Sequence, residues 1–73
     1  MDKNDVLEYL AKAGESDATE AAAVFDVSYA TAAMALLRLT RQNLVARFVD
    51  PEHGTYWYRL SPRGQARLKY FHS

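Results

Sequence analysis

The hydrophobic pattern of the chain changes its period at Asn43, and this change constrains the fold more than any other feature. Before Asn43, apolar side chains recur at the spacing typical of helices that bury one face. After it, "LVARFV" and "TYWYRL" are β-branched and aromatic segments that alternate with period 2. The residues between them, "DPEHG", favour a turn, so the two segments predict a β-hairpin.

Capping residues delimit the helical segments and add a last helix after the hairpin. Asp17 with Glu20 is typical of a capping box, Gly14 is typical of a helix stop, and Asn43 suits the left-handed conformation that ends a helix. Gly64 is expected to weaken the last helix near its start. The predicted helices cover residues 4–13, 18–25, 29–43 and 62–71, with Asp2 or Asn4, Asp17, Ser28 and Ser61 as their N-caps. This order predicts an α+β fold that is mainly helical.

Length and composition predict one small domain over residues 1–73, with 49% apolar residues and a thin core. The absence of cysteine excludes disulfides and thiolate metal sites, which favours a reducing, cytoplasmic environment. The acidic start "MDKNDVLEYL" is unlike a signal peptide, and no apolar run approaches the ~20 residues of a membrane span. We therefore expect a cytoplasmic protein with no membrane partner.

The net charge of zero conceals a division along the chain. Residues 1–26 carry a net charge of −5, whereas residues 27–73 carry +5 and hold six arginines. A positive second half could form one electropositive face, as expected of a phosphate-binding surface. The alternative is an ordinary solvated surface on which the charges are scattered.

Two segments resemble the MarR-type and related prokaryotic transcriptional regulators. These are residues 18–47, "ATEAAAVFDVSYATAAMALLRLTRQNLVAR", and residues 58–64, "YRLSPRG". The matching positions are Ala22, Phe25, Val27, Ser28, Leu39, Leu44 and Val45. The chain departs from the family pattern at Asn43, where glycine is usual, and it ends at Ser73, where fuller regulators continue into dimerisation helices.

This resemblance implies a winged helix-turn-helix domain, with a three-helix core, a two-stranded β-hairpin wing and a short C-terminal helix. Its third helix would lie at the major groove of double-stranded DNA, with the wing on the backbone or the adjacent minor groove. It further implies a small prokaryotic transcriptional regulator that acts as a homodimer. Readout could be sequence-specific or guided by DNA shape.

Helical geometry gives the third helix a mostly apolar outward face. Arg, Lys, Asn and Gln, which usually read base edges, are absent between residues 28 and 37. We expect thymine-methyl contacts through Ala33 and Met34, hydrogen bonds from the first turn, and convergence of the arginines at 38, 41, 47 and 59 on phosphates. The candidate DNA-binding residues are Ser28, Tyr29, Thr31, Ala33, Met34, Arg38, Arg41, Arg47 and Arg59.

The same apolar face also supports an alternative function, a winged-helix module that binds protein for oligomerisation or docking. Met34 and Leu37 are either buried under the wing or the last helix, or they form an exposed patch typical of an interface. Trp57, on the hairpin face opposite Tyr58, is expected to be an exposed anchor for a partner. The candidate interface residues are Ala30, Met34, Leu37, Trp57 and Tyr70.

The sequence predicts neither an enzyme nor a cofactor. His53 lies in the turn beside Glu52 and His72 is the penultimate residue, and neither has a second ligand at helical spacing or a carboxylate cluster. The sequence also has no glycine-rich phosphate loop and no cysteine nucleophile. With so thin a core, an effector pocket would have to form between subunits.

Overall fold

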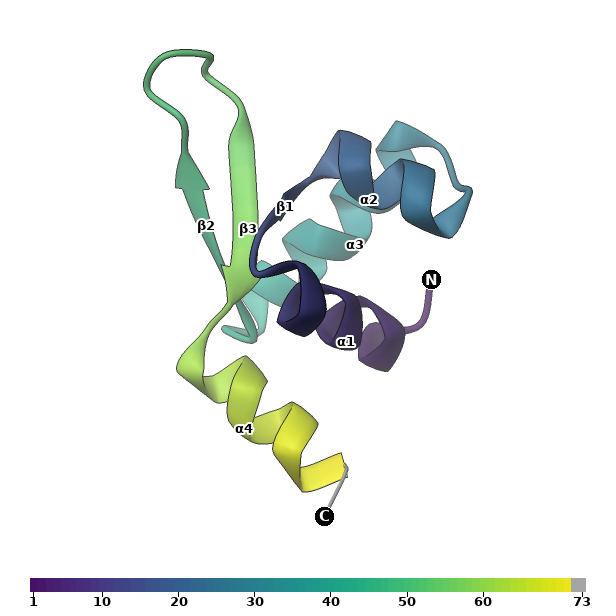
Figure 1. Ribbon diagram of the computed structural model, residues 1–73, viewed down its shortest axis with the longest axis vertical. Helices are drawn as coiled ribbons and strands as arrows, with labels where there is room; N and C mark the ends of the chain where they lie inside the picture. Colours follow the sequence, from purple (N-terminus) through teal and green to yellow (C-terminus); the bar gives the residue numbers. More distant parts are fainter. Residues whose placement is uncertain (72–73) are drawn as a thin grey trace.

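The computed structural model describes residues 1–71, which form four α-helices and a three-stranded antiparallel sheet (Figure 1). The elements in chain order are α1 (Lys3–Ala13), β1 (Ser16–Asp17), α2 (Ala18–Phe25), α3 (Tyr29–Arg41), β2 (Val45–Val49), β3 (Tyr56–Leu60) and α4 (Pro62–Phe71). The predicted order of three helices, a hairpin and a closing helix is confirmed, as is the mainly helical α+β class. His72, weighed above as a catalytic residue, lies outside the described residues.

The first three helices begin at the caps that the sequence indicated. Each capping side chain accepts a backbone N–H of the helix that it opens: Asp2 from Asn4 at 3.2 Å, Asp17 from Glu20 at 2.8 Å, and Ser28 from Thr31 at 3.1 Å. The first turn of a helix leaves such N–H groups without a partner inside the helix. Each cap therefore stabilises its helix by about 1 kcal/mol.

Helices α2 and α3 form the helix-turn-helix unit. Asp26 adopts the left-handed conformation, with φ 54°, and the N–H of Val27 donates to the carbonyl of Ala22 at 3.0 Å. The chain consequently turns by 112° between the two helices, within the range usual for this motif. Ala21 and Ala32 are fully buried, and their small side chains let the two helices approach closely.

The connection after α3 holds the start of α4. Asn43 has the predicted left-handed conformation, with φ 62°, and its carbonyl accepts the Ser61 hydroxyl at 2.6 Å. The carbonyl of Leu44 accepts the N–H of Ser61 at 3.1 Å, and the Ser61 hydroxyl in turn accepts the N–H of Gly64 at 3.0 Å. A Cβ at Gly64 would overlap the carbonyl oxygen of Leu44. Gly64, expected only to weaken α4, is thus the residue that permits this contact.

The sheet contains a third strand that the sequence did not indicate. β1 pairs with β3, with Ser16 opposite Tyr58, and the strand order is β1-β3-β2. Ser16 is completely buried, and its hydroxyl lies 2.7 Å from the hydroxyl of Tyr9. Because this hydrogen bond satisfies the buried polar group, β1 fixes the base of the hairpin to α1 without the cost of an unpaired hydroxyl.

The core lies between the three N-terminal helices and the base of the hairpin. Its buried apolar residues are Val6, Leu7, Leu10, Ala18, Ala21, Ala32, Leu36, Leu39, Leu44, Val45 and Tyr58. The predicted inward positions of α3 are confirmed at Ala32, Leu36 and Leu39, whereas Ala35 is half-buried. Since the strands of the wing add only Val45 and Tyr58 to these buried residues, the turn at its tip lies outside the core.

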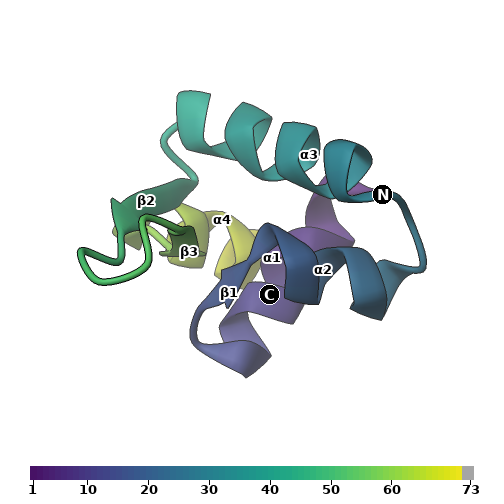
Figure 2. The ribbon, with the colours of Figure 1, turned by 90° about the horizontal axis from the view of Figure 1, so that it is seen from above.

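The views show how these elements leave α3 accessible. In Figure 1 the hairpin rises on one side of the helices and α4 lies below them, whereas in Figure 2 α3 forms one outer edge of the molecule. Within residues 1–71, no single helix is long and apolar enough to cross a membrane, and only α2 and α3 taken together across their bend reach that length and composition.

Candidate nucleic-acid interface

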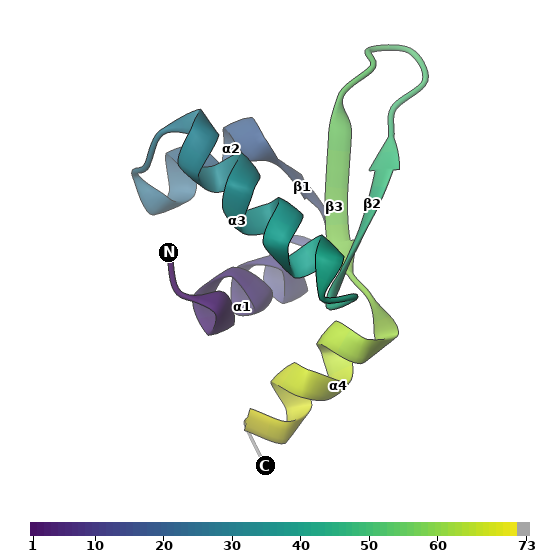
Figure 3. The same ribbon diagram turned by 180° about the vertical axis from the view of Figure 1, so that it is seen from behind.

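The outward face of α3 is an exposed helical surface beside the wing. In Figure 3 the helix crosses the front of the molecule, with the hairpin at its side and α1 beneath it. Ala30, Met34 and Arg41 are exposed along this face, and Leu37 is half-buried. Neither the wing nor α4 covers Met34, which is 44% exposed, so the interpretation that it is buried beneath them is wrong.

The hydroxyl groups of the first turn of α3 are largely engaged within the helix. Ser28 accepts the N–H of Thr31 and donates its own proton to the Thr31 hydroxyl at 2.9 Å. Thr31 therefore keeps its proton for an external acceptor, whereas Ser28 has none to give. Tyr29 is 62% exposed and faces the wing, where it lines a cleft with Tyr56 and Gly54.

An apolar stripe occupies the middle of the outward face. We define it as Ala30, Met34 and Leu37, which follow helical spacing and lead to Arg41. Ala33, which the sequence placed on this face, is instead half-buried against the core. The reason is that the half-buried surface of α3 extends further toward the hairpin than the four predicted inward positions suggested.

Arg38 lies on the flank of α3 that faces α1. It lines a shallow cleft there together with Lys3, Gln42 and Met1. Two cations thus lie beside the C-terminal half of α3, and one of them comes from the acidic first third of the sequence. Sequence reasoning missed Lys3, because only the packing of α1 against α3 brings its ammonium group to this side.

The two wing arginines lie on opposite faces of the hairpin. In the register of β2 with β3, Arg47 is opposite the buried Tyr58, whereas Arg59 is opposite Ala46. Arg47 shares the face that looks toward the helices, and its guanidinium lies 4.2 Å from the ring centre of Tyr56. The expectation that the four arginines converge is therefore wrong for Arg59.

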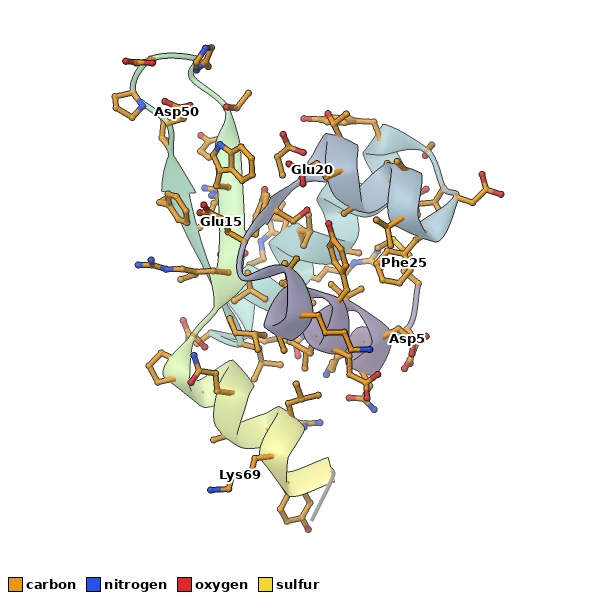
Figure 4. The ribbon with its side chains drawn as sticks, viewed as in Figure 1. Asp5, Glu15, Glu20, Phe25, Asp50 and Lys69 are labelled. Atoms are coloured by element: carbon orange, nitrogen blue, oxygen red, sulfur yellow. The ribbon has the colours of Figure 1, made fainter. Side chains whose placement is uncertain are left out.

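The outer face of the hairpin has a different character. The Arg59 guanidinium lies 5.1 Å from the ring centre of Phe48 on this face. Glu15 and Asp50, labelled in Figure 4, line a cleft here with Phe48 and Trp57. Trp57 is half-buried rather than exposed, so Tyr56, at 47% exposure, is the more accessible ring of the wing.

The tip of the wing is acidic. The carboxylate of Asp50 lies 2.9 Å from Nδ1 of His53 and accepts the N–H of Glu52 at 2.9 Å. The hydrogen bond from His53, followed by that from Glu52, holds the pKa of Asp50 below its ordinary value of 3.8. Since Asp50 is ionised at neutral pH and Glu52 is exposed beside it, the tip disfavours close contact with phosphate.

The basic side chains beside α3 have no acidic partner. Across residues 1–71, no carboxylate lies within ion-pair distance of Lys3, Arg38, Arg41 or Arg47.

Tyr70, a candidate for a protein interface, is 78% exposed on α4, which contacts α1 and β3. Neither Trp57 nor Tyr70 joins the apolar stripe, so the structure does not bring the five proposed interface residues together. In the same part of the chain, no group of three or more histidine and acidic side chains could hold a metal ion.

Comparison with known proteins identifies the fold. No protein-family model matches the chain, and no curated protein matches its sequence. Among solved structures, a mutant of MarR from E. coli in complex with operator DNA matches with a TM-score of 0.88 and 22% identity, over 96% of this chain and 51% of that one. A probable transcriptional regulator from Pseudomonas aeruginosa matches with a TM-score of 0.82 and 26% identity, over 92% and 52%. YusO from Bacillus subtilis matches with a TM-score of 0.86 and 24% identity, over 92% and 48%.

These likenesses confirm the predicted resemblance at the level of the fold. The chain has the winged-helix fold of MarR-type regulators, with β2–β3 as the wing. It spans about half the length of the solved structures that it matches.

Proposed function

We propose, from the winged-helix fold that this chain shares with MarR-type regulators, that it binds double-stranded DNA as a small transcriptional regulator. The observation that carries the proposal is the exposed outward face of α3, bordered on both sides by cations that form no ion pair with any acidic residue among residues 1–71. The similar MarR structure contains operator DNA, which supports the same partner for this chain. The proposal includes action as a homodimer in the cytoplasm of a prokaryote.

In this arrangement α3 lies at the major groove and its flanks bind the phosphates. Arg38 and Lys3 contact one strand from the α1 side, and Arg41 contacts the backbone from the last turn of α3. Arg47 reaches the backbone from the inner face of the wing, where the ring of Tyr56 supports its guanidinium. A homodimer would place two such helices about one duplex turn (~34 Å) apart.

The wing binds through its lower inner face rather than its tip. Arg47 lies in the middle of β2, while Asp50 and Glu52 lie in the turn beyond it. Phosphates attract the guanidinium of Arg47 and repel the carboxylates of Asp50 and Glu52. Arg59, on the outer face, contributes only through the general field of the molecule.

Salt dependence and a charge comparison test this function. We expect affinity for duplex DNA to fall steeply with salt, and Arg38→Ala with Arg41→Ala to lower the slope of log affinity against log salt by about 2, since each phosphate contact contributes about 0.9. Arg59→Ala, which removes one positive charge from the outer face, is the control and should leave this slope nearly unchanged, whereas Arg38→Ala or Arg41→Ala alone should lower it by about 1. Fluorescence anisotropy over a salt series measures both, and an absence of binding at low ionic strength would contradict the proposal.

A second function is favoured by one observation, the exposure of Ala30 and Met34 in the apolar stripe on a molecule with no net charge. In this alternative α3 binds another protein or a second copy of the chain, and DNA is not a partner. It requires that the wild-type chain associates in sedimentation experiments, that Leu37→Glu abolishes the association, and that no DNA binding occurs at low ionic strength.

A further inference from the structure

The apolar stripe of α3 is about as long as a short run of base pairs in DNA. Ala30 and Leu37 are seven residues apart, which corresponds to about 10 Å along a helix. Base pairs in DNA rise by about 3.4 Å, so a helix lying along the groove would place the stripe over roughly three of them. The position of the stripe at the centre of the outward face makes it the part of α3 closest to the base edges.

The stripe offers no hydrogen bond to those edges. Its three side chains are apolar, and the neighbouring Ser28 hydroxyl has already donated its proton to Thr31. Only the Thr31 hydroxyl, on the flank, keeps a proton for an external acceptor. The discrimination of bases by forked hydrogen bonds, which uses Arg, Asn or Gln, is therefore absent from the centre of this helix.

The C5-methyl group of thymine is the apolar feature of the major groove that such a surface fits. The small side chain of Ala30 lets the backbone of α3 approach the groove closely. Met34 is exposed, flexible and polarisable, and so can follow the contour of a methyl group.

The charges around the stripe favour a polyanion over an apolar protein surface. Arg41 ends the stripe, Arg38 and Lys3 lie on its α1 flank, and Arg47 lies on the inner face of the wing. A partner that covered the stripe with apolar groups alone would leave these cations without anions. Duplex DNA supplies both a methyl-bearing groove and phosphates on each side of it.

On the basis of the DNA-binding function proposed above, we propose that the Ala30–Met34–Leu37 stripe reads thymine methyl groups. The preferred DNA then has A·T pairs under α3, and thymine is distinguished from cytosine by its methyl group instead of by a hydrogen bond. Burial of one methyl group corresponds to roughly a fourfold gain in affinity.

Replacement of thymine by deoxyuridine tests this inference, because it removes the methyl group and keeps the base pairing. Duplexes of about two helical turns (~20 base pairs) would be selected from a random pool by the wild-type chain, and each thymine of the best binder would then be replaced in turn. We expect two or three adjacent positions at which deoxyuridine weakens binding by roughly fourfold each. Deoxyuridine elsewhere in the same duplex is the internal control.

A variant assigns the effect to the stripe. Met34→Ala should bind the thymine duplex several-fold more weakly and should lose its sensitivity to deoxyuridine at one of these positions. Val24→Ala removes a similarly exposed apolar side chain, 59% accessible, from α2 and should keep the full sensitivity. Met34 and Val24 are both exposed, so neither change should disturb folding, which circular dichroism checks.

The outcomes separate the inference from the function on which it depends. Binding that is equal for thymine and deoxyuridine at every position would overturn methyl readout and leave DNA binding intact. Sensitivity to deoxyuridine that persists in Met34→Ala would overturn the assignment to the stripe. No binding of any duplex by the wild-type chain, together with self-association that Leu37→Glu removes, would overturn both proposals in favour of a protein interface.

Discussion

Gly64 shows how packing can require a residue of low helix propensity inside a helix. Glycine inside a helix costs up to about 1 kcal/mol relative to alanine. Here the first turn of α4 lies directly against the carbonyl of Leu44, and a Cβ would occupy the position of that oxygen. The hydrogen bonds of Ser61 to Asn43 and Leu44 hold the two segments together at this point, so the backbone has little room to move.

Helix propensity and steric overlap predict opposite changes in the free energy of unfolding for Gly64→Ala. Helix propensity alone would stabilise the protein by up to about 1 kcal/mol, whereas the overlap should destabilise it by ~1–3 kcal/mol. We expect the second effect to be larger because the overlapping atom belongs to the backbone. Urea unfolding measures the difference, with Gln65→Ala, an exposed position of the same helix, as the control. An increase in the free energy of unfolding for Gly64→Ala would show that the overlap with the Leu44 carbonyl does not destabilise the variant.

The wing is an element whose parts have different roles. Val45 at its base and Tyr58 in the middle of β3 belong to the core, Arg47 lies opposite Tyr58 on the face toward the helices, and the tip carries an acidic turn. The side-chain hydrogen bonds of the turn are centred on Asp50, while the N–H groups of Asp50 and Gly54 pair with the carbonyls of Thr55 and Asp50 at 2.9 and 2.8 Å. The side-chain part of this hydrogen bonding thus depends on the charge state of one carboxylate.

The pH dependence of this turn follows from the lowered pKa of Asp50. A carboxyl group whose pKa is lower in the folded state contributes stability above its unfolded pKa, near 3.8, and this contribution is lost as the pH falls through the folded value. We expect the Glu52 amide to lose its protection against exchange, relative to the intrinsic rate at each pH, as the pH falls, and Asp50→Asn to have lost this protection already at neutral pH. NMR hydrogen exchange measures this, with Glu52→Gln as the control. Exchange of the same rate in Asp50→Asn and in the wild-type chain would mean that the carboxylate does not order the turn.

At the scale of the whole molecule, the fold redistributes the charges of the sequence. The first 26 residues carry a net charge of −5, yet Lys3 lies beside Arg38 on the flank of α3. Conversely, Arg59 belongs to the basic part of the sequence but lies on the outer face of the hairpin. Glu15, from the acidic part, lines a cleft on that same face. The basic surface around α3 is therefore made of residues selected by packing rather than by position in the chain.

The two lysines of α1 test this redistribution. Lys3 faces the flank of α3, whereas Lys12, on the same helix, lines a cleft with Leu68 of α4. We expect Lys3→Ala to weaken DNA binding and to lower the salt slope by about 1, and Lys12→Ala, with the same change of charge, to leave the slope unchanged. Anisotropy titrations over a salt series compare them. Equal effects of the two substitutions would indicate that only the net charge matters.

The sequence by itself determined the four helices, the hairpin and their order. Caps such as Asp17 and Ser28, the left-handed Asn43 and the change of hydrophobic period depend on interactions within one or two turns of the chain, so they can be read from neighbouring residues. The outward direction of Met34 on α3 follows from the same helical geometry, whereas its exposure, which the sequence left open, was decided by the position of the wing and α4.

Only the tertiary structure decided what these elements bring together. β1 is two residues long and contains a buried serine, so it shows no alternation that could reveal a strand. The separation of Arg47 from Arg59 depends on the register of the hairpin, and the placement of Lys3 beside Arg38 depends on how α1 packs on α3. The physical reason is that pairing and packing involve residues distant in the chain, whose contacts no local pattern encodes.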